Sequence, residues 1–143
     1  MDVTRPSCGG YTVEKTLGMG GNAVVKLVSK VDGDSGERKE YAMKIFEPHQ
    51  SNFAAGGKLD KNWQDFIQKT QFEYDIVRKL NSGKIIKYYD FNPDAVWHKK
   101  NGQDKKCAYL LMEIVDGVEL FDFFRSGQEI DEKMMRHVFL NVV

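Results

Sequence analysis

The first third of the chain alternates apolar and polar residues with the two-residue period of β-strands. In residues 11–17 the alternate positions form two faces, one with Tyr11, Val13, Lys15 and Leu17 and the other with Thr12, Glu14 and Thr16. Further apolar runs follow at residues 24–28 and 40–46, and turn-forming residues separate them at 32–36. The pattern predicts three strands, each joined to the next by a short turn.

The middle of the chain changes to the period of an α-helix. Between about residues 61 and 80, side chains at spacings of three and four share one face, namely Phe66, Thr70, Glu73, Val77 and Leu80. Either Asp60 or Asn62 is suited to cap the start of this helix, and Gly83 is a typical stop. We therefore predict one long helix with an inward face that includes Glu73.

The strand pattern returns in the second half of the chain. Residues 84–91 are predicted to form a fourth strand, which Asn92 and Pro93 interrupt and residues 96–97 extend. A hairpin turn at residues 101–102 leads to a fifth strand at 107–115, whose nearly continuous apolar run predicts burial on both faces. Two short helices are expected after it, at residues 119–124 and from Asp131 onward.

Composition narrows the class of protein. The chain has 143 residues, 41% hydrophobic and 29% charged, which is typical of a globular domain. Lysine plus arginine and aspartate plus glutamate each number 21, so the balance favours neither nucleic acid nor a membrane surface as a partner. Cys8 and Cys107 form no disulfide framework and indicate a reducing compartment. We expect a cytoplasmic protein, with the nucleus as an alternative, and a flexible leader at residues 1–10.

Glycines cluster between the first two strands, at positions 18, 20 and 21. A hairpin loop without side chains lets the backbone lie close over a ligand. An ordinary tight turn explains the same residues, and the glycines alone leave both interpretations open. A Rossmann phosphate loop would have to open into a helix, whereas β-branched residues follow here.

Two charged residues occupy apolar settings. Lys44 lies inside the apolar run 40–46, and Glu73 lies within the predicted inward face of the helix. A buried charge needs a partner of opposite sign, so each of the two residues explains the other. The alternative for Glu73 is a position at the edge of the helix face, pointing outward. The histidines, His49, His98 and His137, are scattered and suggest no metal site.

A glycine loop, a strand, a turn and then Ala42-x-Lys44 on the next strand form the opening of the protein-kinase signature set. From about residue 11 to its C-terminus the chain resembles a eukaryotic protein kinase, although Ala23 stands where the family has a third glycine. The resemblance implies an α+β fold. Residues 11–115 would form the kinase N-lobe and the hinge, and the N-lobe would consist of a five-stranded antiparallel sheet with helix C. Residues 116–143 would begin a truncated C-lobe with two short helices.

The resemblance also implies the positions that bind ATP. Lys44 and Glu73 would form the catalytic ion pair that holds the α- and β-phosphates. The loop over the phosphates would consist of Leu17, Gly18, Met19, Gly20, Gly21, Asn22 and Ala23. Val25 and Ala42 would sandwich adenine, and Met112 would be the gatekeeper at the back of its pocket. The Glu113 carbonyl and the Val115 amide would bind the adenine edge. Glu119 would contact the ribose. A helix cap is an equally good account of Glu119.

The rest of the kinase signature set is missing from the sequence. It has no His-Arg-Asp, no Asp-Phe-Gly and no Ala-Pro-Glu, so the family's Mg²⁺ ligands are not in this chain, although Mg²⁺ is expected for the complete kinase. We expect the ATP-binding portion of a serine/threonine kinase that phosphorylates protein hydroxyls when the domain is complete. Residues 112–124 resemble the calcium/calmodulin-dependent type. The alternative is a catalytically inactive kinase-like module that binds a nucleotide or a partner.

The end of the sequence predicts an exposed surface. Residues 131–143 form an amphipathic stripe at Met135, Val138, Phe139 and Val142, with neither a C-cap nor any following residues to pack against. We expect that the chain alone transfers no phosphoryl group. A partner that covers this final helix is a further expectation.

Overall fold

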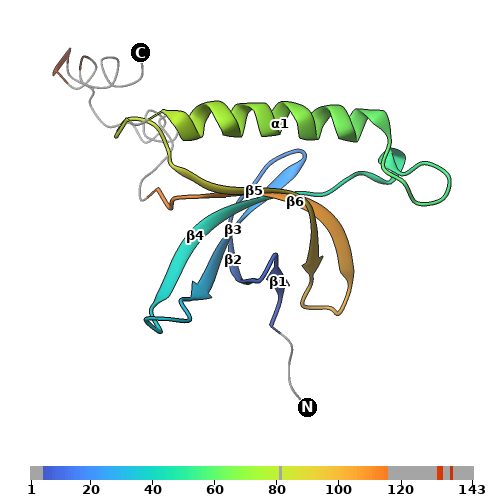
Figure 1. The fold of residues 1–143 in the computed structure, drawn as a ribbon, viewed down its shortest axis with the longest axis horizontal. Coiled ribbons are helices and arrows are strands. Elements are labelled where there is room, and N and C mark those ends of the chain that lie inside the picture. Colours follow the sequence, from blue (N-terminus) through green and yellow to red (C-terminus); the bar gives the residue numbers. More distant parts are fainter. Residues whose placement is uncertain (1–4, 81, 116–131, 134–135, 137–143) are drawn as a thin grey trace.

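A barrel of strands with one long helix across it makes up the part of the chain that the structure describes (Figure 1). This computed structural model describes residues 5–80, 82–115, 132–133 and 136. The strands are β1 (Ser7–Cys8), β2 (Tyr11–Met19), β3 (Ala23–Val31), β4 (Arg38–Phe46), β5 (Tyr88–His98) and β6 (Asp104–Met112). The helices are a short 3-10 turn, η1 (Gln50–Asn52), and the long helix α1 (Lys61–Lys79). All strand pairs are antiparallel, and the order β1-β2-β3-β4-β6-β5 closes on itself.

Strand β1 is the strand that the sequence analysis missed, so the prediction of five strands is wrong. Ser7 and Cys8 pair with β2 on one side and with β5 on the other, which closes the barrel. Gly9 and Gly10 turn the chain between β1 and β2 at φ values of 59° and 87°, which favour glycine. A Cβ atom on Gly9 would also lie 2.5 Å from the ring of Tyr109. The expected loose leader therefore includes a short strand, held by the fully buried Cys8.

The alternation along the strands divides the apolar side chains between two cores. Met43 and Ile45 on β4 face the inside of the barrel, and Phe46 faces outward beneath α1. The inner core consists of Cys8, Val13, Val28, Met43, Ile45, Ala95, Cys107, Tyr109 and Leu111. The outer core consists of Phe46, Trp63, Tyr74, Phe91, Ala108 and Leu110. Strand β6 contributes to both cores, which confirms its predicted burial on both faces.

Helix α1 begins where the Asp60 side chain accepts a hydrogen bond from the Trp63 backbone N–H, at 2.9 Å. Its buried positions are Trp63 and Tyr74, which contact the outer face of the barrel. Glu73 and Leu80 are exposed, so the predicted helix face was rotated by about one residue. Figure 1 shows the helix lying across β5 and β6 on one side of the barrel.

Strand β5 runs through the predicted interruption. Asn92 and Pro93 lie within the strand, where the register to β6 shifts between Asn92 and Ala95. A bulge accommodates a proline because the ladder needs no N–H donor there. The expected helix at residues 119–124 lies outside the described residues, and the helix expected from Asp131 onward is described only at residues 132–133 and 136, which are helical. In the described part, no helix has the length and apolar character needed to cross a membrane.

Candidate functional site

One face of the sheet carries the residues that were predicted to hold adenine. Val25 lies directly opposite Lys44 in the β3–β4 ladder, and Ala42 lies directly opposite Met112 in the β4–β6 ladder. Residues opposite each other across a ladder point to the same side of the sheet. Lys44 is two residues from Phe46, which packs beneath α1, and two residues from Ala42. The backbone register thus places all of these residues on the face that α1 partly covers.

The small side chain of Ala42 lies in the middle of this face. It is 6% exposed, and its cross-strand neighbours are Leu27 on β3 and Met112 on β6. Met112 packs at the edge of the outer core, and Val25 is half-buried. A methyl group at this position keeps the surface between these larger side chains low.

The glycine loop is a closed turn at the end of β2. The Gly20 N–H donates a hydrogen bond to the Ala23 carbonyl oxygen over 2.8 Å. None of Gly18, Gly20 and Gly21 has a positive φ. A Cβ atom added to Gly18 or Gly21 would meet nothing within 4 Å, and one on Gly20 would make only an ordinary contact at 3.7 Å. The fold itself therefore does not require glycine at these positions, in contrast to Gly9.

Lys44 has no ionic partner in the described part of the chain. Its Nζ lies 5.4 Å from the centre of the Phe46 ring, and no carboxylate oxygen of the described residues lies within 4.0 Å of it. Glu73 is exposed, and its Oε1 accepts a hydrogen bond from the Tyr88 hydroxyl at 3.5 Å. The predicted ion pair is therefore not formed here, because Glu73 lies on the flank of α1 rather than on its buried face. Pairing of Lys44 with Glu73 in a ligand complex stays a prediction.

Tyr88 is a residue at this site that the sequence analysis missed. It lies directly opposite Met112 in the β5–β6 ladder, and its ring stacks on Tyr74 of α1 with centroids 6.3 Å apart. Burial raises the pKa of Tyr88, and the charge of Glu73 and the hydrogen bond to it raise the pKa further. The hydroxyl therefore stays protonated at neutral pH and can donate to Glu73. A tyrosine in an apolar strand carries no sequence signal for such a contact.

The segment after β6 is fixed on one side by paired hydrogen bonds. The Glu113 N–H donates to the Lys87 carbonyl oxygen, and the Lys87 N–H donates to Glu113 Oε1, each over 3.0 Å. The Glu113 carbonyl and the Val115 N–H make no hydrogen bond to the residues that the structure describes. These are the two groups that were predicted to bind the adenine edge. Glu119, the predicted ribose contact, lies outside the described residues.

The described residues offer no evident set of metal ligands. Within residues 5–80, 82–115, 132–133 and 136, no group of three or more histidine, cysteine, aspartate or glutamate side chains could hold a metal ion. Val25, Ala42, Lys44 and Met112 share one face, as a nucleotide site would require, and the predicted ATP contacts from Leu17 to Val115 stay a prediction. The same part of the chain does not provide a protein site for Mg²⁺.

Comparisons with known proteins place this geometry in context. The family model for the protein kinase domain matches residues 11–143. The solved kinase domain of Mycobacterium tuberculosis PknI is 20% identical, with a TM-score of 0.60 over 95% of this chain and 46% of that one. A double mutant of the same domain is 19% identical, with a TM-score of 0.63 over 95% and 45% of the two chains. The chain thus spans less than half the length of these solved domains, and at this identity the likeness shows the fold.

Proposed function

Because this chain belongs to the protein kinase family, we propose that it is the ATP-binding portion of a serine/threonine protein kinase. The observation that carries the proposal is the shared face of Val25, Ala42, Lys44 and Met112, next to a glycine loop. In the complete domain, this portion would hold ATP while the γ-phosphate passes to a protein hydroxyl.

Adenine would lie against the low surface at Ala42. Val25 and Met112 flank that surface, and the Glu113 carbonyl and Val115 N–H, which make no hydrogen bond to the described residues, follow directly after β6. A purine needs apolar contact on its faces and a donor and an acceptor at its edge, and these groups supply both. Because the edge contacts are main-chain groups, they depend on the path of the segment more than on its side chains.

The phosphates would lie under the glycine loop, near Lys44. The fold does not need glycine at Gly18, Gly20 or Gly21, so the absence of side chains there is explained by the close approach of a ligand to the backbone. Lys44 is half-buried without an ionic partner among the described residues, which leaves its ammonium free for a phosphate. Glu73 would then steady Lys44 once α1 moves toward it.

The choice of serine/threonine kinase and of protein substrates is the finer part of the proposal. It is supported by the resemblance of residues 112–124 to calcium/calmodulin-dependent kinases. The groups that would orient a substrate hydroxyl and hold Mg²⁺ are absent from this sequence, since it contains neither His-Arg-Asp nor Asp-Phe-Gly. The chain therefore contributes nucleotide positioning, and catalysis would need the remaining groups of the domain.

The proposal is tested by comparing ATP with adenosine as ligands of the 143-residue chain. Isothermal titration or ligand-detected NMR should show that Lys44→Met weakens ATP binding by about tenfold or more, because a charge-assisted contact to phosphate is lost. Adenosine binding should change little. Lys39→Met, which removes the same charge from an exposed position of β4, should leave both affinities unchanged. Equal effects of Lys44→Met on ATP and adenosine would argue against phosphate binding at Lys44.

A further inference from the structure

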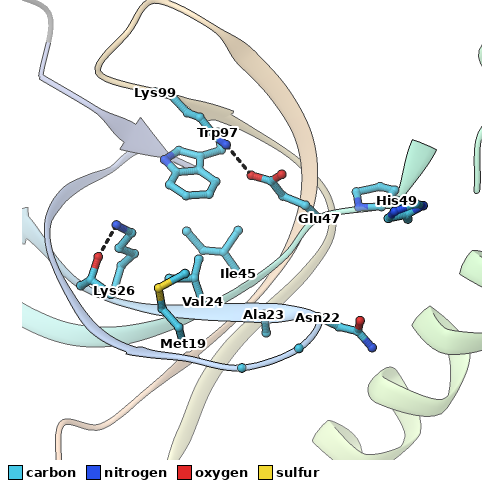
Figure 2. Close-up of a pocket in the computed structure, with 14 residues that line it drawn as sticks. Met19, Asn22, Ala23, Val24, Lys26, Ile45, Glu47, His49, Trp97 and Lys99 are labelled. Atoms are coloured by element: carbon cyan, nitrogen blue, oxygen red, sulfur yellow. Dashed lines mark hydrogen bonds and ion pairs between the residues drawn. The ribbon is translucent and has the colours of Figure 1, made fainter. Parts of the chain in front are cut away.

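A hollow lies on the opposite side of the sheet from the proposed nucleotide site. It has a volume of about 430 Å³ and opens where the glycine loop, the end of β4 and the end of β5 meet (Figure 2). Val24 and Ile45, which line it, face each other across the β3–β4 ladder. Their neighbours Val25 and Lys44 form the next pair of that ladder and point the other way. The hollow therefore lies on the other side of the sheet from Val25 and Lys44, and only residues 19–23 of the glycine loop border both it and the proposed phosphate site.

The polar part of the hollow is built around Trp97 of β5. Lys99 Nζ lies 4.5 Å from the centre of the indole ring, and Lys26 Nζ lies 5.7 Å from it. Figure 2 shows the indole between these lysines, with Lys99 above it and Lys26 at its lower left. Lys99 Nζ forms an ion pair with Glu47 Oε1 at 2.8 Å, so these two charges cancel.

Lys26 keeps its charge without such compensation. Its ammonium donates a hydrogen bond to the Thr16 hydroxyl, and no described carboxylate forms an ion pair with it. Lys26 is also half-buried, so its charge is screened by water less than that of an exposed lysine. After Lys99 and Glu47 cancel, the hollow carries one excess positive charge near its aromatic wall.

Apolar side chains line another part of the hollow. Val24 and Ile45 form the side toward the sheet, and Met19 extends from the glycine loop with 84% of its surface exposed. Methionine is flexible and polarizable, so Met19 can fold onto a ligand that enters the hollow. The volume lies in the range of about 300–1,000 Å³ that is usual for small-molecule sites.

We propose that this hollow binds a small organic anion with a flat apolar body. The anionic group would bind the ammonium of Lys26, and the flat body would lie between Trp97 and the side chains of Met19 and Ile45. The site uses residues on the far side of the sheet from Lys44, and it does not rest on the nucleotide proposal.

The probe for this site is 2-naphthoate, with 2-naphthalenemethanol as its neutral counterpart. In ¹⁵N–¹H NMR titrations of the 143-residue chain, naphthoate should shift the signals of the Trp97 indole N–H and of the Trp97 and Lys99 amides, which lie away from the proposed nucleotide face. It should bind about tenfold more tightly than the alcohol, because only the acid gains a charge-assisted contact. Equal binding of the two probes, or no binding up to about 10 mM naphthoate, would overturn the proposal.

Variants test the role of the Lys26 charge separately from that of the apolar wall at Met19. Lys26→Met should remove most of the preference for the acid, and Lys26→Arg should keep it. Lys30→Met, on the same strand and outside the hollow, should leave it unchanged. If Lys26→Met loses the native spectrum, Met19→Ala provides the second test, because an exposed side chain can be shortened without unfolding the barrel. It should weaken naphthoate binding by about threefold, and unchanged binding would contradict the proposed apolar wall.

Discussion

Lys44 lies directly opposite Val25 in the β3–β4 ladder, and the two side chains share the face of the sheet on which α1 packs. This register is set by the turn between β3 and β4, where the Asp32 N–H donates a hydrogen bond to the Glu37 carbonyl oxygen and the Gly36 N–H donates to the Asp32 carbonyl oxygen, each over 2.8 Å. The turn therefore places Lys44 opposite Val25, while the glycine loop at the other end of β3 would cover the proposed nucleotide site.

Ala42→Phe tests the adenine surface. A phenyl ring at this 6% exposed position should fill the space beside Met112 and weaken adenosine binding by about tenfold or more. The barrel should stay folded, since overpacking costs about 1–3 kcal/mol. Affinity is measured by titration and folding by circular dichroism. The control is Ala54→Phe at an exposed loop position, which should leave the affinity unchanged. Full affinity in a folded Ala42→Phe variant would show that adenine does not bind there.

Trp63→Ala tests how far the packing of α1 stabilises the barrel. Trp63 is 8% exposed in the outer core, so its loss should lower the free energy of unfolding by about 3–5 kcal/mol. Phe72→Ala, on the same helix but 68% exposed, should change it by less than about 0.5 kcal/mol. Urea titrations of both variants give the comparison. Similar losses in the two variants would mean that the buried face of α1 is assigned incorrectly.

Tyr109 should make the stability depend on alkaline pH. Burial raises its pKa from an ordinary value of about 10 to about 12, and the nearby charge of Asp90 acts in the same direction. The folded state thus holds this proton more tightly than the unfolded chain. The resulting stability is complete below pH 10 and is lost as the pH rises through 12. The free-energy difference between wild type and Tyr109→Phe should shrink over this interval by up to about 2 kcal/mol. A free-energy difference that stays constant as the pH rises from 10 to 12 would contradict the raised pKa of Tyr109.

The 143-residue chain should transfer no phosphoryl group. Under the proposed function the glycine loop and Lys44 would position phosphates, but the residues that orient an acceptor hydroxyl and hold Mg²⁺ are missing from the sequence. A radiolabel transfer assay with ATP, Mg²⁺ and a generic protein acceptor measures this directly. Incorporation that disappears in Lys44→Met would show that the missing motifs are dispensable.

Much of the fold follows from local patterns in the sequence. Alternation predicts the central strands, and the helical period together with Asp60 predicts α1 almost to the residue. Strand β1 was missed because two residues carry no periodicity, and only its pairing with β2 and β5 holds it in place. Pro93 was taken for a break because its effect depends on whether the partner strand tolerates a bulge.

The sites were predictable to different degrees. Lys44 and the glycines stand out because a charge in an apolar run and a cluster without side chains are unusual. The exposure of Glu73 depends on a small rotation of α1, which the period alone does not fix. The hollow at Trp97 brings Lys26 together with a residue that is 71 positions away in sequence, and only the closed barrel places them side by side.

The most direct test of the nucleotide site is a map of amide shifts on addition of ATP to the ¹⁵N-labelled chain. We predict that the shifted amides cluster at residues 18–23 and 112–115, with further shifts at Val25, Ala42 and Lys44. The amides of Trp97 and Lys99, on the other side of the barrel, should shift far less. Shifts centred on Trp97 and Lys99, or none up to about 10 mM ATP, would contradict the assignment of this face to the nucleotide.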